Sequence, residues 1–203
     1  MTPHAIVLLA AGRATRYRAA GGPEPTKLLA AWRGEPLVRH AARAALESRA
    51  APVIVVTGHA AEAVLAALAG LAVRPAHNPA FAEGLATSLQ VGIAAVPPAC
   101  PGALVMLADM PAVTPAILDA LLDAALASPD ASAVVPSYGG IRGNPVVLSR
   151  TLFPAVHTLR GDVGARQLLR DPALRVIEVA LSDAGIAHDM DAPADLSEPL
   201  TKA

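Results

Sequence analysis

Residues 6–29 place a short apolar run before a loop of small and cationic residues, a composition suited to binding polyphosphate. The run Ile6–Leu9 has the composition of a strand buried on both faces. The small residues Ala10–Gly12 let backbone N–H groups approach phosphate oxygens closely. Counter-charge is supplied by Arg13, Arg16, Arg18 and Lys27. The segment therefore predicts a binding loop for a nucleoside triphosphate at the carboxyl end of the first strand.

A second candidate for chemistry is Asp109, which follows the apolar run 104–108 just before Pro111. A carboxylate at the carboxyl end of a parallel strand, beside a triphosphate loop, is the hard oxygen ligand that Mg²⁺ prefers. The alternative is a structural aspartate that caps the helix expected to begin near Thr114. Together with the cationic loop, the motif favours the metal ligand.

The segment 188–196 carries three carboxylates, those of Asp189, Asp191 and Asp195. One of them would complete a metal site opposite Asp109, and the spacing does not choose between Asp189 and Asp191. Asp195 suits the alternative role of an acidic cap on a final helix beginning near Pro193.

Segment 78–90 is a candidate for binding the nucleobase. Gly84 would admit a flat base close to the backbone, and Ser88 lies one helical turn further along the same face. An ordinary junction between a loop and a helix is an equal alternative.

Two later loops carry candidates for a second, anionic substrate. Asn144 lies in a Gly-Asn-Pro turn, and Arg166 lies in the first turn of a helix that Asp162 is expected to cap. An amide and a guanidinium on loops suit a phosphate-bearing ligand. Turn chemistry alone is the alternative.

Strand-like and helix-like segments alternate along the chain, which is typical of a doubly wound α/β sheet. The expected strands are 5–10, 53–57, 73–77, 103–108, 133–136 and 176–179. The expected helices are 36–48, 60–68, 84–96, 115–127 and 163–170. The glycine-rich stretch 139–145 predicts a functional loop or a local antiparallel excursion. We expect one domain over residues 1–203.

Two other phosphate-binding motifs do not fit the first loop. A dinucleotide-binding turn needs G-x-G-x-x-G and an acid at the end of the second strand, whereas that strand here ends in Thr57-Gly58-His59. A P-loop needs G-K-[ST], but Lys27 lies between Thr26 and Leu28. An exposed basic loop at the sheet edge is the remaining alternative.

The composition excludes several classes of protein. A 203-residue chain that is 54% hydrophobic and 16% charged is expected to fold. A net charge of −1 with 2% aromatic residues disfavours nucleic-acid binding. The sole cysteine, Cys100, has no partner for an internal disulfide or a metal site. The uncharged span between Glu83 and Asp109 is broken by prolines, so we expect no membrane segment and a cytoplasmic protein.

Taken together, these motifs resemble the MobA-like nucleotidyltransferases over nearly the whole chain, and most closely the molybdenum cofactor cytidylyltransferases. The segments that carry the resemblance are LAAG-R-x-x-R (9–16), KLL (27–29), NPAFAEGLATSL (78–89), LADMP (107–111), GNP (143–145), GDVGAR (161–166) and DMDAPADL (189–196). The chain departs from the family in its first loop, where Tyr17-Arg18 replaces Met-Gly and extra residues precede Lys27.

The resemblance implies a Rossmann-like, mostly parallel sheet with helices on both faces, similar to the nucleotide-diphospho-sugar transferases. It also implies Mg²⁺-dependent transfer of a nucleoside monophosphate, with CTP favoured because the loop reads LAAG where the guanylyl branch reads LAGG. The acceptor would be the terminal phosphate of a molybdopterin carrying molybdenum. A molybdoenzyme or its maturation factor would be a further partner.

The same resemblance assigns roles to the candidate residues. The catalytic ones are Arg16, Lys27 and Asp109; the nucleotide-binding ones are Leu9, Ala10, Ala11, Gly12, Arg13, Gly84 and Ser88; the acceptor-binding ones are Asn144 and Arg166; and the metal ligands are Asp109, Asp189 and Asp191. Three alternatives stay open: a transferase that uses GTP or a sugar phosphate, a non-catalytic nucleotide-binding maturation partner of a molybdoenzyme, and an NAD-dependent oxidoreductase.

Overall fold

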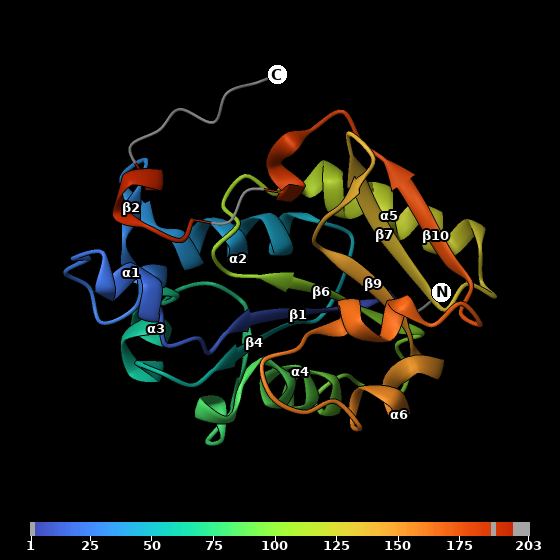
Figure 1. Cartoon of the computed structure of the whole chain (residues 1–203), viewed down its shortest axis with the longest axis horizontal. Coiled ribbons are helices and arrows are strands. Elements are labelled where there is room, and N and C mark those ends of the chain that lie inside the picture. The colour runs from blue at the N-terminus through green and yellow to red at the C-terminus, as the bar shows by residue number, and fades with distance from the viewer. Residues whose placement is uncertain (1–2, 188–189, 197–203) are drawn as a thin grey trace.

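The computed structural model describes residues 3–187 and 190–196, which form a three-layer α/β fold (Figure 1). In this part of the chain an 8-stranded sheet has the order β10-β7-β9-β6-β1-β4-β5, with β8 paired to β7. The strands are β1 (Ala5–Ala10), β4 (Val53–Thr57), β5 (Arg74–His77), β6 (Gly102–Leu107), β7 (Ala133–Tyr138), β8 (Ile141–Arg142), β9 (Val146–Ser149) and β10 (Val176–Ala180). A small separate sheet contains β2 (Ala31–Trp32) and β3 (Glu35–Pro36).

Helices cover both faces of the sheet (Figure 1). The α-helices are α1 (Thr15–Ala19), α2 (Leu37–Glu47), α3 (Ala61–Ala67), α4 (Leu85–Ala94), α5 (Pro115–Ala127) and α6 (Phe153–Val156). The 3₁₀ helices are η1 (Lys27–Leu29), η2 (Phe81–Glu83), η3 (Arg150–Leu152), η4 (Ala165–Arg170), η5 (Ala184–Ala187) and η6 (Pro193–Leu196). No helix among the described residues is long and apolar enough to cross a bilayer.

Strand β1 is central because it contributes to both hydrophobic cores. Ile6 and Leu8 pack on one face, in the core that α2, α3 and α5 cover. Val7 and Leu9 pack on the other face, beneath α4 and α6. Alternation along a strand sends successive side chains to opposite faces, so an uninterrupted apolar run is buried on both. The interpretation of this run as a doubly buried strand is confirmed, since β1 is buried throughout.

The chain reverses direction across the sheet between β1 and β6. From β1 it proceeds outward through β4 to β5, then returns to pair β6 with the other edge of β1. The crevice beyond the carboxyl ends of strands at such a switch point is where open α/β sheets bind ligands. The loops that follow β1 and β6 both begin at this crevice.

The predicted fold class is confirmed, and the bounds of β1, β4 and α5 match those expected. Helix α5 is capped as expected, because the Thr114 hydroxyl accepts a hydrogen bond from Ile117 N at 3.4 Å. The glycine-rich stretch does introduce antiparallel pairing, of β8 with β7 and of β9 with both β6 and β7.

One expected cap is wrong. The helix predicted over 163–170 is the 3₁₀ helix η4, which begins at Ala165 with Gly164 at its N-cap, so Asp162 does not cap it. The short helix α1 and the strand β9 were not expected. Their formation depends on tertiary contacts, because a five-residue helix and a four-residue strand have weak local signals.

Helix α4 lies unusually close to the sheet at Gly92. A β-carbon built at this position would overlap Val7 Cγ1 and lie 3.0 Å from Val56 Cγ2. The absence of a side chain therefore sets the depth at which α4 packs against β1 and β4.

We expect Gly92→Ala to lower the free energy of unfolding by about 1–3 kcal/mol, although alanine favours helix, because the added methyl overpacks the core. Urea denaturation monitored by circular dichroism measures this change. Adding Val7→Ala should restore part of the loss by opening space for the methyl. A Gly92→Ala chain as stable as the unmodified one would contradict the close packing.

Candidate active site

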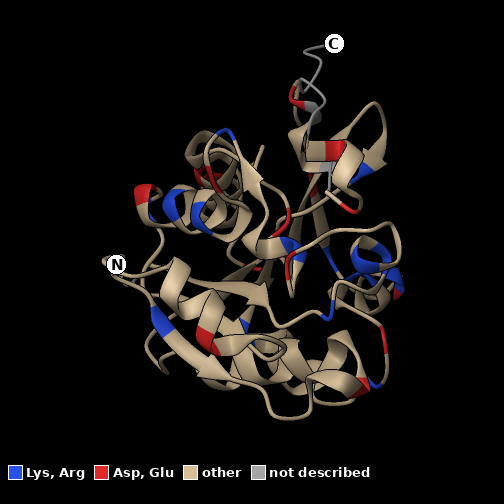
Figure 2. Ribbon diagram, turned by 90° about the vertical axis from the view of Figure 1, so that its left-hand side faces the viewer, with Lys and Arg blue, Asp and Glu red and all other residues tan. Residues whose placement is uncertain are grey.

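A pocket of about 430 Å³ opens at the crevice beyond β1 and β6, within the size range of small-molecule sites. It is lined by Leu9, Ala11, Gly12, Arg13, Ala14, Thr15, Thr26, Lys27, Leu28, Phe81, Ala82, Glu83, Gly84, Leu85, Ser88, Leu107, Asp109 and Asp162. Basic and acidic residues are interspersed over the molecule in the view of Figure 2. The charge that a bound ligand meets is therefore set by the side chains near the pocket and not by the molecule as a whole.

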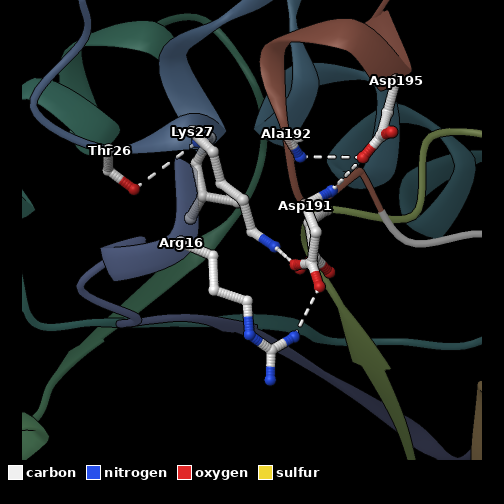
Figure 3. Close-up of polar contacts among 8 residues, drawn as sticks. Arg16, Thr26, Lys27, Asp191, Ala192 and Asp195 are labelled. Carbon is white, nitrogen blue, oxygen red and sulfur yellow. Dashed lines mark hydrogen bonds and ion pairs between the residues drawn. The ribbon is translucent and has the colours of Figure 1, made fainter. Parts of the chain in front are cut away.

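Lys27 lies between two carboxylates at this pocket. Its ammonium is 2.7 Å from Asp109 Oδ2 and 2.5 Å from Asp191 Oδ1. The other oxygen of Asp191 accepts a hydrogen bond from the Arg16 guanidinium at 2.7 Å (Figure 3). Side chains 164 and 175 residues away from Asp191 in sequence thus converge on it. Three carboxylates were predicted as metal ligands. Those of Asp109 and Asp191 meet at Lys27, and Asp189 lies outside the described residues.

Local structure explains how Lys27 and Asp109 reach this point. Lys27 begins η1, whose N-cap is Thr26; the Thr26 hydroxyl accepts a hydrogen bond from Leu28 N at 3.5 Å. Asp109 closely follows the end of β6, and the adjacent parallel strand β1 delivers its loop to the same edge. Asp109 does not cap α5, because Thr114 does.

Asp191 is positioned by the segment on either side of it. Met190 N donates to Asp109 O at 3.0 Å, and the Met190 side chain is buried against Trp32 and Leu37. Asp195 Oδ2 accepts hydrogen bonds from the backbone N–H groups of residues 191 and 192, both at 2.7 Å (Figure 3). Asp195 thus lies in the first turn of η6 as an acidic residue and caps the N–H groups just before the helix, as the third helical residue does in a capping box.

The charges in this cluster support one another. Burial by itself lowers the pKa of Lys27, but the ion pairs with Asp109 and Asp191 outweigh it, and the pKa is raised overall. The pKa of Asp191 is lowered, chiefly by the hydrogen bond from Lys27 and to a smaller extent by Arg16. At neutral pH the cluster holds a protonated lysine and an ionised Asp191.

One oxygen of Asp109 is available to a cation. Asp109 Oδ1 is buried and has no hydrogen-bond partner among the described residues, whereas buried carboxylate oxygens normally have one. With Asp191 it offers two hard oxygen ligands, the number that Mg²⁺ commonly takes from protein when phosphates and water supply the rest. No group of three or more acidic, histidine or cysteine side chains suited to a metal occurs in the described part of the chain.

The loop after β1 presents its backbone to the pocket. Space around Gly12 is open, since a β-carbon there would have no neighbour within 4 Å. Of the predicted phosphate-loop residues, Leu9, Ala11, Gly12 and Arg13 line the pocket, while Ala10 is buried behind it. Arg16, with 82% of its side chain exposed, turns to Asp191. Arg18 lines an adjoining open pocket with His59, and this pocket shares Arg13, Thr15, Phe81 and Ala82 with the first.

Gly84 lines the pocket, and the structure gives a reason for glycine there that the sequence did not predict. Its φ is 116°, and a β-carbon would overlap the Gly161 carbonyl and lie 2.7 Å from Asp162 N. Glycine is thus required for contact with another loop of the chain, and the approach of a flat base stays a prediction. The Gly161 carbonyl also accepts a hydrogen bond from Ala86 N at 3.1 Å.

Ser88 lies on α4 as predicted, faces the pocket and is buried. Its hydroxyl accepts a hydrogen bond from Asn78 Nδ2 at 3.0 Å. The position of this hydroxyl therefore depends on a residue outside the helix.

The two acceptor candidates lie together, but not in the main pocket. Asn144 and Arg166 line a second pocket of about 230 Å³ with Arg142 and Arg170. The Arg166 guanidinium donates to Arg142 O at 3.4 Å. The structure therefore groups these residues in a cationic recess that shares no lining residue with the pocket of Lys27.

Several lining residues were not predicted. Phe81 and Glu83 lie within the segment singled out for Gly84 and Ser88, and Asp162 was assigned to a helix cap. The aromatic ring in a chain with few aromatics was the signal available for Phe81. Asp162 carried no such signal, because its place depends on the close contact of its loop with Gly84.

We expect Lys27→Ala to lower the free energy of unfolding by about 1–3 kcal/mol in metal-free buffer, because it removes the cation between Asp109 and Asp191 and leaves Asp191 with the exposed Arg16 alone. Added Mg²⁺ should raise the melting temperature of this variant more than that of the unmodified chain, since the ammonium no longer competes. Arg18→Ala, which removes an exposed cation from the same loop, is the control. An equal response to Mg²⁺ in all three proteins would contradict the assignment.

The lowered pKa of Asp191 predicts how stability depends on pH. Its stabilising contribution is present above the unfolded pKa of about 3.9 and is lost as the pH falls through the lower folded value. The stability difference between the unmodified chain and Asp191→Asn should therefore be constant near neutral pH and shrink in acid. Urea titrations across this range measure it. A difference that does not change with pH would show that the ion pair contributes nothing.

Comparison with known proteins places this site in a family. The MobA-like NTP transferase domain matches residues 6–178. Rv0371c from Mycobacterium tuberculosis H37Rv is 32% identical in sequence. Its structure superposes with a TM-score of 0.79, and the match covers 96% of each of the two chains. The same protein has been solved in complex with manganese (31% identity, TM-score 0.72, 89% of each chain). Mth528, a nucleotidyl transferase from a Methanothermobacter species, is 26% identical with a TM-score of 0.82, over 96% of this chain and 94% of that one.

Two curated relatives differ in how much they share with the chain. Nicotine blue oxidoreductase from Paenarthrobacter nicotinovorans is 33% identical over 190 residues, 91% of this chain and 90% of that protein. Bifunctional protein GlmU from Anaeromyxobacter sp. (strain K) is 46% identical over 67 residues, so the match spans 33% of this chain and 13% of GlmU. The family match extends over most of the chain, from β1 to β10. The chain belongs to the MobA-like NTP transferase family, and its fold is that of a nucleotidyltransferase.

Proposed function

We propose that this chain transfers CMP from CTP to the terminal phosphate of a molybdenum-bearing molybdopterin, with release of pyrophosphate. The observation that carries the proposal is the ammonium of Lys27, held between Asp109 and Asp191 at the edge of the pocket below the β1 loop. This arrangement supplies the charges that nucleotidyl transfer requires, at the switch point of the sheet. The reaction would take place in the cytoplasm, with residues 1–203 acting as one domain.

In the proposed reaction an oxygen of the acceptor phosphate attacks the α-phosphorus, and the bond from that phosphorus to the bridging oxygen of pyrophosphate breaks. The backbone N–H groups of Ala10–Arg13 and the Arg16 guanidinium bind the β- and γ-phosphates. Lys27 neutralises charge that develops on the α-phosphate. Binding of the anionic substrate would draw Lys27 and Arg16 away from Asp191.

Asp109 and Asp191 would hold Mg²⁺, which would offset the negative charge of the phosphates. The unpartnered Asp109 Oδ1 supports this role. In-line transfer of this kind depends on position and charge more than on acid–base catalysis. Movement of Lys27 to the substrate would leave the carboxylates of Asp109 and Asp191 available as metal ligands.

The base and the acceptor are assigned to the two pockets that share no lining residue. Ser88 and the Gly84 backbone lie on the side proposed for cytosine. The recess of Asn144, Arg142, Arg166 and Arg170 is proposed for the anionic acceptor, because guanidinium groups suit phosphate oxygens. A molybdoenzyme or its maturation factor would receive the product.

A second candidate function follows from one relative. Nicotine blue oxidoreductase matches nearly the full length of the chain, which favours reduction of a heterocyclic substrate as an alternative. The ion cluster of Lys27, Asp109 and Asp191 favours phosphate chemistry, and the second strand lacks the acid expected of a dinucleotide site. Oxidation of NADH or NADPH in the presence of heterocyclic dyes tests this candidate directly.

We expect CTP with Mg²⁺ to stabilise the chain more than GTP, ATP or UTP in a thermal unfolding assay. A ligand at about 100 times its dissociation constant adds about 2.7 kcal/mol to stability. Asp109→Ala should remain folded but lose the stabilisation by CTP. It should also no longer release pyrophosphate from CTP when molybdopterin is the acceptor.

The alternative outcomes separate the candidates. Preferential stabilisation by GTP would keep the transferase and overturn the choice of base. Binding of CTP without pyrophosphate release would indicate a non-catalytic nucleotide-binding partner. Full turnover by Asp109→Ala would remove that carboxylate from the mechanism.

A further inference from the structure

Asn78 makes a complete set of hydrogen bonds beside the proposed base site. It follows β5, is 1% exposed, and does not line the pocket itself. Its Oδ1 accepts a hydrogen bond from Ala80 N at 3.0 Å. Its Nδ2 donates to Thr87 Oγ1 at 2.9 Å and to Ser88 Oγ at 3.0 Å.

The orientation of the Asn78 amide follows from these partners. A backbone N–H can only donate, so the amide atom that faces Ala80 must be the oxygen. The amide nitrogen then faces the two hydroxyls, and each of them must accept one of its hydrogens. Asn78 therefore sets the polarity of both hydroxyl groups.

The hydrogens of the two hydroxyls go to different places. Thr87 can donate to Gly84 O at 2.9 Å or to Ala80 O at 3.0 Å. Ser88 Oγ, by contrast, has no acceptor for its own hydrogen within hydrogen-bond distance among the described residues, although the residue is only 4% exposed. Because Ser88 lines the pocket, a bound ligand is the partner left for that hydrogen.

We propose that Asn78 is a positioning residue that makes Ser88 a hydrogen-bond donor toward the nucleobase. The site then selects a base that presents an acceptor atom at this position, such as N3 or O2 of cytosine. A base that presents an N–H group there would leave two donors facing each other in a buried site. The inference rests on the proposed binding of CTP in this pocket.

The variant Asn78→Asp tests the inference, because it keeps the shape of the side chain and reverses its polarity. At pH 8 the ionised carboxylate of this variant would still accept from Ala80 N, but it would also accept the Ser88 hydrogen and turn a lone pair of Ser88 toward the base. We expect the Kd for CTP to rise about tenfold or more, since a donor is lost and an acceptor then faces an acceptor. The Kd for tripolyphosphate, which lacks a base, should not change. Isothermal titration calorimetry measures both values.

The control is a cycle with Ser88→Ala, which removes the hydroxyl that Asn78 orients. Ser88→Ala alone should raise the Kd for CTP and leave the Kd for tripolyphosphate unchanged. In the Ser88→Ala background, Asn78→Asp should have no further effect on the ratio of the two Kd values. If the role of Asn78 were merely structural, Asn78→Asp would raise the Kd for both ligands, and by the same factor with Ser88 as with alanine at position 88.

Asn78→Ala provides a second variant if the aspartate chain does not fold. It leaves the Ser88 hydroxyl free to donate or accept. The Kd for CTP should therefore rise by less than in Asn78→Asp, while the Kd for tripolyphosphate does not change. An unchanged ratio of the Kd values in either folded variant would overturn the inference alone. Failure of the unmodified chain to bind CTP, while it binds another nucleotide or none, would instead overturn the proposed function.

Discussion

The ion pairs of Lys27 with Asp109 and Asp191 are the contacts on which the site depends. They join the loop after β1, the end of β6 and the segment around Met190, which are distant in sequence. Two carboxylates so close together would repel each other without a cation between them. The cluster therefore requires positive charge, which Lys27 and Arg16 supply here and which a metal ion would supply in the proposed reaction.

The sheet makes this convergence possible. Because β1 and β6 are parallel neighbours at the switch point, their loops emerge at the same edge. Packing on both faces of β1 holds that edge rigid, and Gly92 lets α4 approach the sheet closely enough to bring Ser88 to the pocket. Rigid elements hold side chains at a defined separation, which transfer of a nucleotidyl group demands.

Backbone contacts between loops shape the rest of the pocket. Gly84 is held against the Gly161 carbonyl with a positive φ, and this contact places Asp162 at the pocket wall. Asn78 lies behind the residues that line the pocket. Its side-chain amide is hydrogen-bonded to one backbone N–H and to two hydroxyls. In the proposed function, recognition of the base would depend on residues behind the lining as much as on the lining itself.

The amino-acid sequence by itself determined the α/β class, most strand positions, the Thr114 cap and the motifs around Lys27, Asp109 and Ser88, because these have local signals of composition and period. Only the tertiary structure decided that Lys27 bridges two carboxylates and that Asn144 and Arg166 share a separate recess. It also decided why residue 84 is glycine and how Asn78 orients Ser88. The ion cluster and the Gly84 contact join segments far apart in the chain, and spacing along a sequence does not encode distances across a fold. Asn78 and Ser88 are only 10 residues apart, but their contact depends on how the turn between β5 and α4 folds.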